Sequence, residues 1–358
     1  MKITTERLQE ATSKAIKGAG FNTLIPLTSM IGIELKDNTL YLKTTDMTNN
    51  VISVVDKVAG EDVDVTIDAD KFGKLIAKMT STDITLTVQE DCLQIEGNGV
   101  YKLPLISDED GLVEFPKIEI PELTKQVKLT SVMDIYNTNR YALAKTMEQP
   151  ALTGYYCGKN VTISTDTLVI TFNQFGFSDE DILISPQMMQ LLTLNKQENI
   201  SADNIDGQLY FATDDLIIAG PMLEGIEDYP VSSIMQYLDI EYESSCKIPK
   251  GLLLDVLDRL SLFIEPYDKN GAYFAFGRKG INIHSKKDAS AETINYIDSK
   301  NFKPFVCCVD VPLLKEQLQS IPEDTVQMFY GDENALKLVC GKIVQVIALL
   351  EDEELGNE

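Results

Sequence analysis

Apolar and polar residues along this chain change repeatedly between a helical period and an alternating one. Apolar residues three and four positions apart predict six helices, at 5–19, 69–79, 130–146, 186–194, 249–264 and 311–320. Between them, short alternating runs such as 39–44 and 83–88 predict strands, separated by turn residues such as Asp37-Asn38. The pattern therefore predicts helices packed on largely antiparallel sheets, an α+β architecture.

The same order of elements occurs three times. Each copy begins with a short strand and a helix, at Lys2-Ile3-Thr4, Lys128-Leu129-Thr130 and Lys247-Ile248-Pro249. The second helix of each copy follows a residue suited to cap it, which is Asp68, Ser185 or Asp310. Repeats of this length predict three domains of one fold, at 1–123, 124–240 and 241–358. The segments 107–123 and 224–239 are predicted linkers, and we expect the acidic C-terminal tail to be disordered.

The composition is that of a globular protein. The 358 residues are 44% hydrophobic, yet no apolar run is long enough to span a bilayer, and the first residues, Met1–Arg7, lack the apolar core of a signal peptide. We therefore expect a cytoplasmic protein without membrane contact. The six cysteines have no metal-ligand spacing and are predicted to be buried free thiols.

The net charge of −25 argues by itself against nucleic acid, which usually binds basic surfaces. The charge is unevenly divided, however, because the six predicted helices sum to +4 and leave −29 for all other residues. Lys71, Lys74 and Lys78 share one side of a predicted helix. One interpretation is a solvated helix face. The other is that the helices form a surface for a polyanion, which the acidic remainder of the chain repels.

Residue patterns typical of catalysis are missing from the sequence. The single histidine, His284, lies in a predicted strand without a partner motif, and no glycine-rich phosphate loop, nucleophile elbow or paired-cysteine metal site occurs. Acidic pairs such as Glu61-Asp62 and Asp214-Asp215 fall at predicted turns. We therefore expect no enzyme activity, no cofactor and no metal. An enzyme with a carboxylate–metal site is the less favoured alternative.

Several motifs resemble, in their order along the chain, those of the bacterial-type DNA polymerase III beta sliding clamp. They are Thr23-Leu24-Ile25-Pro26-Leu27, the run 37–42, Thr44-Thr45-Asp46, Glu114-Phe115-Pro116, Thr165-Asp166 and Asp228-Tyr229-Pro230. The resemblance covers nearly the whole chain and implies the DNA clamp fold. It further implies a head-to-tail homodimer, a ring of six domains around duplex DNA that tethers a DNA polymerase without chemistry of its own. A clamp loader is the other implied partner, and the sequence fits both a cellular and a phage-encoded clamp.

The helix charges and the resemblance together indicate residues that face DNA. Because a ring is retained by its topology, weak contacts with phosphates suffice and permit sliding. Gln149 falls near a glutamine that touches DNA in the family, whereas the loop Gly20-Phe21-Asn22 lacks the arginine often found there. The DNA-binding residues that we predict are Lys14, Lys17, Lys71, Lys74, Lys78, Arg140, Gln149, Lys196 and Lys250.

The family also binds short peptides of its polymerase and loader in an apolar pocket between the second and third domains. Carried over, the pocket would be lined by Leu168, Ile170, Pro230, Ile234, Met235, Val346, Ile347 and Leu349. The family's glycine-histidine-arginine-leucine run reads Thr167-Leu168-Val169-Ile170 here, and the C-terminus continues into acidic residues. The resemblance therefore implies a pocket whose peptide preference differs.

The dimer contact would join the closing edge of the first domain, at Tyr101 and Leu103, to the third domain near Leu262 and Phe263. Pairing an edge strand across a subunit boundary also removes an aggregation hazard. A β-rich oligomeric scaffold without a DNA role is the alternative from another class. It predicts no functional effect when the helix lysines are removed.

Overall fold

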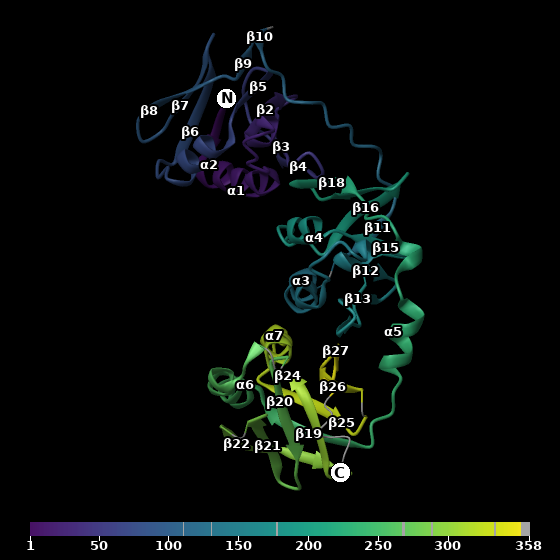
Figure 1. Cartoon of the computed structure of the whole chain (residues 1–358). Helices are drawn as coiled ribbons and strands as arrows, with labels where there is room; N and C mark the ends of the chain where they lie inside the picture. The colour runs from purple at the N-terminus through teal and green to yellow at the C-terminus, as the bar shows by residue number, and fades with distance from the viewer. Residues whose placement is uncertain are drawn as a thin grey trace. The chain divides into compact units, whose positions relative to one another are not determined.

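The chain forms two compact units, each built from two separate stretches. Figure 1 labels the helices and strands along the chain. The computed structural model describes residues 1–351 except positions 110, 130, 177, 267, 268, 288 and 333. The first unit comprises Met1–Leu129 and Gln187–Met222, and the second comprises Thr130–Pro186 and Leu223–Glu358. These boundaries are not those of the predicted repeats, and the division into three domains stays a prediction. The acidic tail predicted after Glu351 lies outside the described residues.

An eight-stranded antiparallel sheet and a four-stranded one form the first unit. The larger has the order β11 (Gln126–Lys128), β16 (Asn199–Ile205), β17 (Gln208–Ala212), β18 (Leu216–Pro221), β4 (Asn50–Val55), β3 (Thr39–Thr45), β2 (Met30–Lys36), β5 (Val63–Asp68). The smaller has the order β1 (Lys2–Thr4), β6 (Asp83–Val88), β7 (Cys92–Glu96), β8 (Val100–Pro104). The pair β9 (Ser107–Asp108) and β10 (Gly111–Leu112) lies in a predicted linker.

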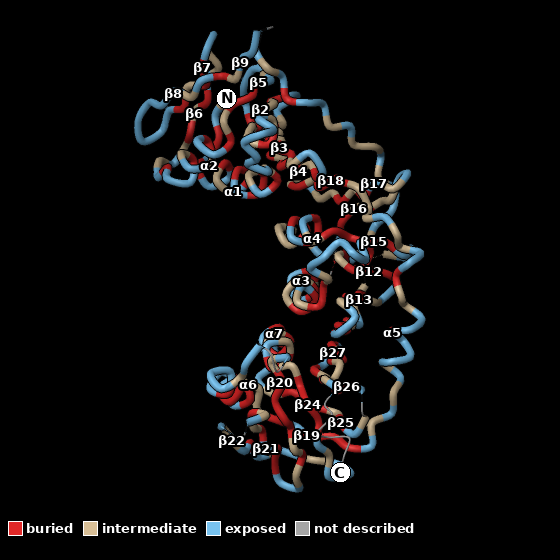
Figure 2. Tube along the Cα trace, in the orientation of Figure 1, coloured by how far each residue is buried: buried red, intermediate tan, exposed pale blue. Residues whose placement is uncertain are grey.

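Helices of the first unit pack their apolar sides on these sheets. They are α1 (Thr5–Ala15), which continues into the 3-10 turn η1 (Ile16–Gly18), the 3-10 turn η2 (Pro26–Ser29), α2 (Ala69–Ala77) and α4 (Pro186–Leu192). Leu8 of α1 and Phe72 of α2 are buried in one apolar cluster with the alternate residues Leu40 and Leu42 of β3 (Figure 2). The segment 116–125, in contrast, contains no buried residue.

The second unit also contains two antiparallel sheets. The nine-stranded sheet has the order β15 (Ile182–Ile184), β12 (Tyr155–Gly158), β13 (Val161–Thr165), β14 (Val169–Asn173), β27 (Ile343–Ala348), β26 (Ala335–Cys340), β25 (Thr325–Tyr330), β19 (Ser244–Pro249), β23 (Asp298–Lys300). The other has the order β22 (Ala291–Asn295), β21 (Gly280–Ser285), β20 (Gly271–Phe276), β24 (Phe305–Asp310).

Four α-helices belong to the described part of the second unit, besides Pro186 at the start of α4. They are α3 (Val132–Asn139), α5 (Val231–Leu238), α6 (Lys250–Leu260) and α7 (Val311–Ser320), with 3-10 turns η3 (Arg140–Ala142), η4 (Pro150–Thr153), η5 (Ile226–Asp228) and η6 (Ser261–Phe263). Two predicted caps are confirmed. Asp68 accepts a hydrogen bond from the backbone N–H of Lys71 at 2.7 Å, and Asp310 accepts one from that of Leu313 at 2.9 Å.

Two strand pairs join stretches that lie far apart in the sequence. In the first unit β4 pairs with β18, so that Val51 faces Ile218. In the second unit β14 pairs with β27, so that Ile170 faces Val346. Each pair connects one predicted repeat to the next through a continuous sheet. This explains why the compact units cut across the repeats.

Two predictions of secondary structure are wrong. The helix expected over 130–146 is short, because α3 ends at Asn139, one 3-10 turn follows, and Leu143 is buried in an extended conformation rather than on a helix. The linker expected over 224–239 contains α5, whose Ile234 is buried. Pro230 immediately precedes α5 and needs no amide partner there.

All six cysteines are buried thiols, as expected. Within the described ranges, every helix is too short or too polar to cross a membrane.

Candidate DNA-facing groove and apolar pocket

α1 and α2 line an open groove of about 690 Å³ in the first unit. Gln9 of α1 donates its Nε2 to the backbone carbonyls of Ile76 and Met79, both at 2.9 Å, and so fixes α1 to the end of α2. Gly73 permits the close approach, because a Cβ at that position would lie 3.0 Å from Ile16. The residues that line the groove are Glu6, Gln9, Glu10, Thr12, Ser13, Ile16, Lys17, Gly73, Ala77 and Lys196.

Five of the lysines predicted to bind DNA lie on this groove or on the adjoining α2. Lys17 and Lys196 line the groove, and Lys71, Lys74 and Lys78 are exposed on α2 and its C-terminal cap. Lys74 is 2.7 Å from Asp70, a pair so exposed that it holds the lysine weakly. Within the part of the chain that the structure describes, Lys17, Lys71 and Lys78 form no ion pair. The groove thus offers cations that are free to meet a polyanion.

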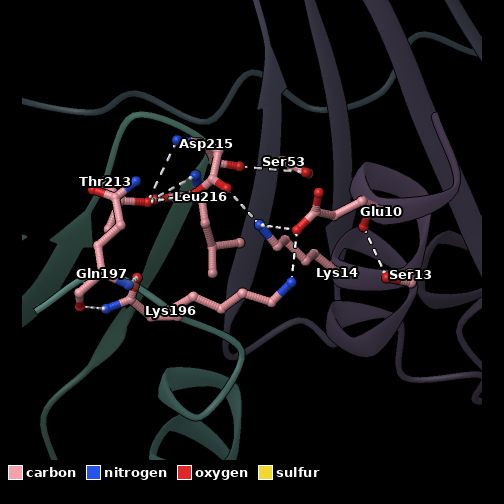
Figure 3. A network of polar contacts seen from close by, with 10 residues as sticks. Glu10, Ser13, Lys14, Ser53, Lys196, Gln197, Thr213, Asp215 and Leu216 are labelled. Atoms are coloured by element: carbon pink, nitrogen blue, oxygen red, sulfur yellow. Dashed lines mark hydrogen bonds and ion pairs between the residues drawn. The ribbon is translucent and has the colours of Figure 1, made fainter. Parts of the chain in front are cut away.

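Lys14 is turned into the first unit instead (Figure 3). Its Nζ donates to Asp215 Oδ2 at 2.5 Å and lies 3.5 Å from Glu10 Oε1, and the side chain is only 7% exposed. Thr213 Oγ1 donates to the other oxygen of Asp215 at 2.9 Å. Burial acts to raise the pKa of Asp215, but the hydrogen bonds from Lys14 and Thr213 and the charge of Lys14 leave it below its usual value. Asp215 and Glu10 both pair with the Nζ of Lys14, so the geometry gives no support to the prediction that Lys14 binds DNA.

Glu10 connects this ion pair to Lys196. The Nζ of Lys196 donates to Glu10 Oε1 at 2.8 Å (Figure 3). That hydrogen bond, with the charges of Lys14 and Lys196, lowers the pKa of Glu10, and the same hydrogen bond raises the pKa of Lys196. Lys196 stays exposed, so its pair with Glu10 can open when a competing anion approaches.

The three other residues predicted to bind DNA belong to the second unit. Arg140 is exposed, donates to Tyr141 Oη at 2.8 Å and lies 4.7 Å from the centre of that ring. Lys250 is half-buried and donates its Nζ to the carbonyl of Ile321 at 2.6 Å. Gln149 lines a cavity of about 570 Å³ whose other polar residues are the carboxylates Glu148, Glu224, Glu227 and Asp228. The negative charges of these carboxylates would repel a DNA phosphate at Gln149.

A turn between β13 and β14 fixes Leu168 in an outward position. Asp166 Oδ1 accepts hydrogen bonds from the backbone N–H groups of Leu168 and Val169, at 3.0 and 2.9 Å. Thr167 has a φ of 81° and donates its N–H to Thr165 Oγ1 at 3.1 Å. Leu168 is therefore held with 55% of its surface exposed. Residues 45–49 of the first unit form the same turn, with Asp46 in the place of Asp166.

Leu168 borders an apolar pocket of about 290 Å³ in the second unit. Among the predicted lining residues, Leu168, Ile170, Val346 and Leu349 are on its wall. The backbone N–H of Ala348 donates to the carbonyl of Leu168, and the backbone N–H of Leu349 donates to the carbonyl of Asn334, both at 2.8 Å. These hydrogen bonds hold the lining segments of the pocket together. The complete lining is Thr167, Leu168, Ile170, Tyr237, Asn334, Ala335, Val346, Ala348, Leu349, Leu350 and Glu351.

The other predicted pocket residues are not on this wall. Ile347 is fully buried in the core of the second unit, because alternate residues of β27 point to opposite faces. Pro230, Ile234 and Met235 do not line the pocket, and α5 contributes Tyr237 instead. Tyr237 was not predicted at the pocket because the segment 224–239 was expected to be a linker. The helical spacing of Val231, Ile234, Met235 and Leu238 was the signal that could have found α5.

The residues predicted at a dimer contact are accessible to different degrees. Tyr101 lies exposed on β8, the edge strand of its sheet, whereas Leu103 on the same strand packs partly against the core. Leu262 and Phe263 of η6 are exposed. β24 is also an edge strand, and its Val306 is exposed. Part of the β24 edge is already covered, because the backbone N–H of Leu350 donates to the carbonyl of Cys308 at 2.9 Å. Each unit therefore has apolar side chains beside an edge strand.

Over the described ranges, His, Cys, Asp and Glu side chains form no cluster of three or more that could hold a metal. His284 lies on β21, with its ring 5.2 Å from that of Tyr273. Its Nδ1 is 3.3 Å from the carbonyl of Ser285.

Comparisons with known proteins give a match for the N-terminal part of the sequence and similar structures for the whole chain. The family model for the DNA polymerase III beta subunit, N-terminal domain, matches residues 1–118. The fold is similar to that of the DNA polymerase beta subunit of Streptococcus pyogenes (TM-score 0.84, 14% identity), the DNA polymerase III beta subunit of Thermotoga maritima (0.83, 15%) and the DNA polymerase sliding clamp of Bacillus subtilis (0.81, 16%). Each alignment covers 98% of this chain and 98–99% of the other. No curated protein sequence matches the chain significantly. The predicted α+β clamp fold is confirmed.

Proposed function

We propose that this chain is a sliding clamp of the DNA polymerase III beta family, which encircles duplex DNA and tethers the replicative polymerase. The observation that carries the proposal is the match of residues 1–118 to that family, in a chain whose whole length has the clamp fold. A clamp confers processivity by keeping the polymerase on its template. It needs no chemistry, cofactor or metal of its own. The scaffold and the carboxylate–metal enzyme are not favoured.

The charge distribution supports contact with DNA at the α1–α2 groove. The chain as a whole carries −25 and repels a polyanion, whereas Lys17, Lys71 and Lys78 are exposed and unpaired there among the described residues. Lys74 and Lys196 add charges held only in exposed pairs. A few cations of this kind bind phosphates weakly and without sequence preference, which suits a ring that must slide.

Two edge strands support a homodimer. We propose that β8 of one copy meets β24 of the second copy, beside Leu262 and Phe263, and that two copies of three domains each close a ring. An exposed edge strand with apolar neighbours is an aggregation hazard unless another strand covers it. Tyr101 and Val306 would then lie at the contact.

The apolar pocket of the second unit is the proposed docking site for the DNA polymerase and the clamp loader. Its mouth presents Leu168 and Tyr237, side chains able to anchor a short peptide, while Val346 forms part of its buried wall. We place the protein in the cytoplasm, bacterial or that of an infected host, with the replication machinery.

Changing Lys71, Lys74 and Lys78 together to glutamate tests the proposal. The substitution reverses three charges beside the groove and leaves the buried side of α2 intact, so the fold should persist. We expect loading onto primed DNA and the length of processive synthesis to fall about tenfold or more, since each lost phosphate contact weakens binding and each new carboxylate repels DNA. Primer-extension assays with a loader and polymerase that accept this clamp would measure both.

A matched variant controls for the change in net charge. Lys36, Lys117 and Lys159 are exposed and lie outside the helices, so their joint change to glutamate alters net charge equally. This variant should load normally, and equal losses in both variants would contradict the DNA-facing groove. The wild type and both variants should sediment as dimers at micromolar concentration. A monomeric wild type would contradict the ring.

A further inference from the structure

The charge at the apolar pocket is one-sided. Glu351 is the only charged residue among those that line it within the described chain. Glu351 therefore places a negative charge at the pocket, which attracts a cationic ligand and repels an anionic one.

The cation on the neighbouring strand is already engaged. Lys337 lies on β26, two positions from Ala335 on the pocket wall. Its Nζ donates to the carbonyls of Leu238 at 2.6 Å and Ile240 at 3.4 Å, and lies 5.3 Å from the centre of the Tyr242 ring. Lys337 thus closes the end of α5. It does not line the pocket, and its hydrogen bonds go to backbone carbonyls rather than to Glu351.

The mouth also contains an aromatic ring. Tyr237 of α5 lines the pocket and is about half exposed, so part of its ring is free. A tyrosine face attracts lysine and arginine side chains, and a carboxylate beside the same opening pairs with them. Tyr237 and Glu351 therefore favour a cation at the mouth, while Ile170 and Val346 favour an apolar side chain below it.

We propose that the pocket takes a peptide segment of a partner protein in which a large apolar anchor stands next to a lysine or arginine. The apolar anchor fills the cavity, and the basic side chain meets Glu351 and the Tyr237 ring. The inference rests on the proposed function, which assigns the pocket to polymerase and loader peptides. Because the Asp166 turn already holds Leu168 in place, little ordering of the pocket opposes binding.

Three labelled peptides test the inference on the full chain. Each contains the apolar core Leu-Val-Leu-Phe, flanked on both sides by two lysines, two glutamines or two glutamates. Fluorescence anisotropy at low salt should give the tightest binding for the lysine peptide and the weakest for the glutamate peptide, about three- to tenfold apart. The difference should shrink as salt is raised. Glu351→Lys should reverse the order.

Two further variants separate the possible outcomes. Glu61→Lys changes the net charge equally at an exposed position of the first unit, and must leave the order unchanged, or else the preference reflects the charge of the whole chain. Leu168→Ser removes a mostly exposed anchor and should weaken all three peptides. If Leu168→Ser weakens binding but the three peptides bind equally, the charge preference is overturned and the docking pocket survives. If no peptide binds, or Leu168→Ser changes nothing, both the inference and the pocket assignment fall, while the lysine variants still decide the DNA role.

Discussion

α1 and α6 are the same local structure put to different uses in the two units. Each helix has eleven residues, follows a short strand and continues into a 3-10 turn. Each carries a cation at its tenth position, Lys14 or Arg259. Lys14 is almost fully buried against Asp215, whereas Arg259 is 57% exposed and donates to both oxygens of Glu292, at 2.8 and 2.7 Å. The helix thus sets the position of the cation, and the residues on neighbouring strands determine whether its ion pair is buried or exposed.

α2 and α7 show the same separation of local structure from charge. Both begin at an aspartate that caps the helix, Asp68 or Asp310. α2 and its C-terminal cap display exposed lysines beside the groove, while Lys315 of α7 pairs with Asp258 and Glu316 lies 3.6 Å from Lys145. The residues that start a helix are therefore repeated between the units, and the exposed, unpaired lysines are not.

The largest difference is expected between Asp215→Asn and its counterpart Glu292→Gln. Asp215→Asn leaves Lys14 buried, with Glu10 at 3.5 Å as its remaining carboxylate. We expect the free energy of unfolding to fall by about 1–3 kcal/mol, less than for a fully buried pair because Asp215 is half exposed. Equilibrium urea unfolding, followed by hydrogen exchange in α1, would measure it. An equal loss in Glu292→Gln would erase the contrast between α1 and α6.

The pH dependence of Asp215→Asn gives an independent check. The folded-state pKa of Asp215 lies below its unfolded value, so the stabilisation is present above about pH 4 and is lost as pH falls through the folded pKa. The difference between the wild type and Asp215→Asn should therefore be full at pH 7 and shrink below about pH 4. A difference that grew on acidification would mean that the ion pair is not the source of the stability.

The two caps should respond alike, with a smaller effect. Asp68→Ala and Asp310→Ala each remove an acceptor from the first turn of a helix and should each lower the free energy of unfolding by about 1 kcal/mol. Asp68→Asn and Asp310→Asn keep an acceptor and serve as controls. Urea unfolding would measure all four. A large loss at only one of the two positions would show that the helices are not equivalent.

The smallest effect is expected at the exposed pair itself. The hydrogen bond from Arg259, against a small opposing effect of burial, lowers the pKa of Glu292, yet the pair stands in solvent. Glu292→Gln should leave the midpoint of thermal unfolding unchanged within error, at low and at high salt. A clear downward shift would show that the α6 pair stabilises its unit as the α1 pair does.

Local pattern was enough to predict the α+β class because most elements have their own signal. Asp68 and Asp310 precede apolar residues at helical spacing, and β3 alternates apolar Leu40 and Leu42 with polar neighbours. The prediction of the sliding-clamp family rested on motifs spread along the chain. The match of residues 1–118 to the family's N-terminal domain supports it, and the clamp fold of the whole chain is confirmed.

The candidate sites were predicted less completely because they depend on distant residues. Lys14 has the same local context as an exposed lysine, and only Asp215, 201 positions later, draws it inward. Tyr237 enters the pocket because α5 contacts β27, which no local pattern of either segment reveals. Ile347 was assigned to the pocket beside Val346, although adjacent residues of a strand face opposite sides.

The pairing of β4 with β18 has a consequence for synthesis on the ribosome. Ser53 and Asp215, which meet across this pair, are 162 positions apart in a chain of 358. At about 5–20 residues per second, β4 waits on the order of 10 s for its partner to be translated. During almost half of translation the nascent chain therefore carries an uncovered strand edge, which is the interval in which a chaperone would protect it from neighbouring chains on the same messenger RNA.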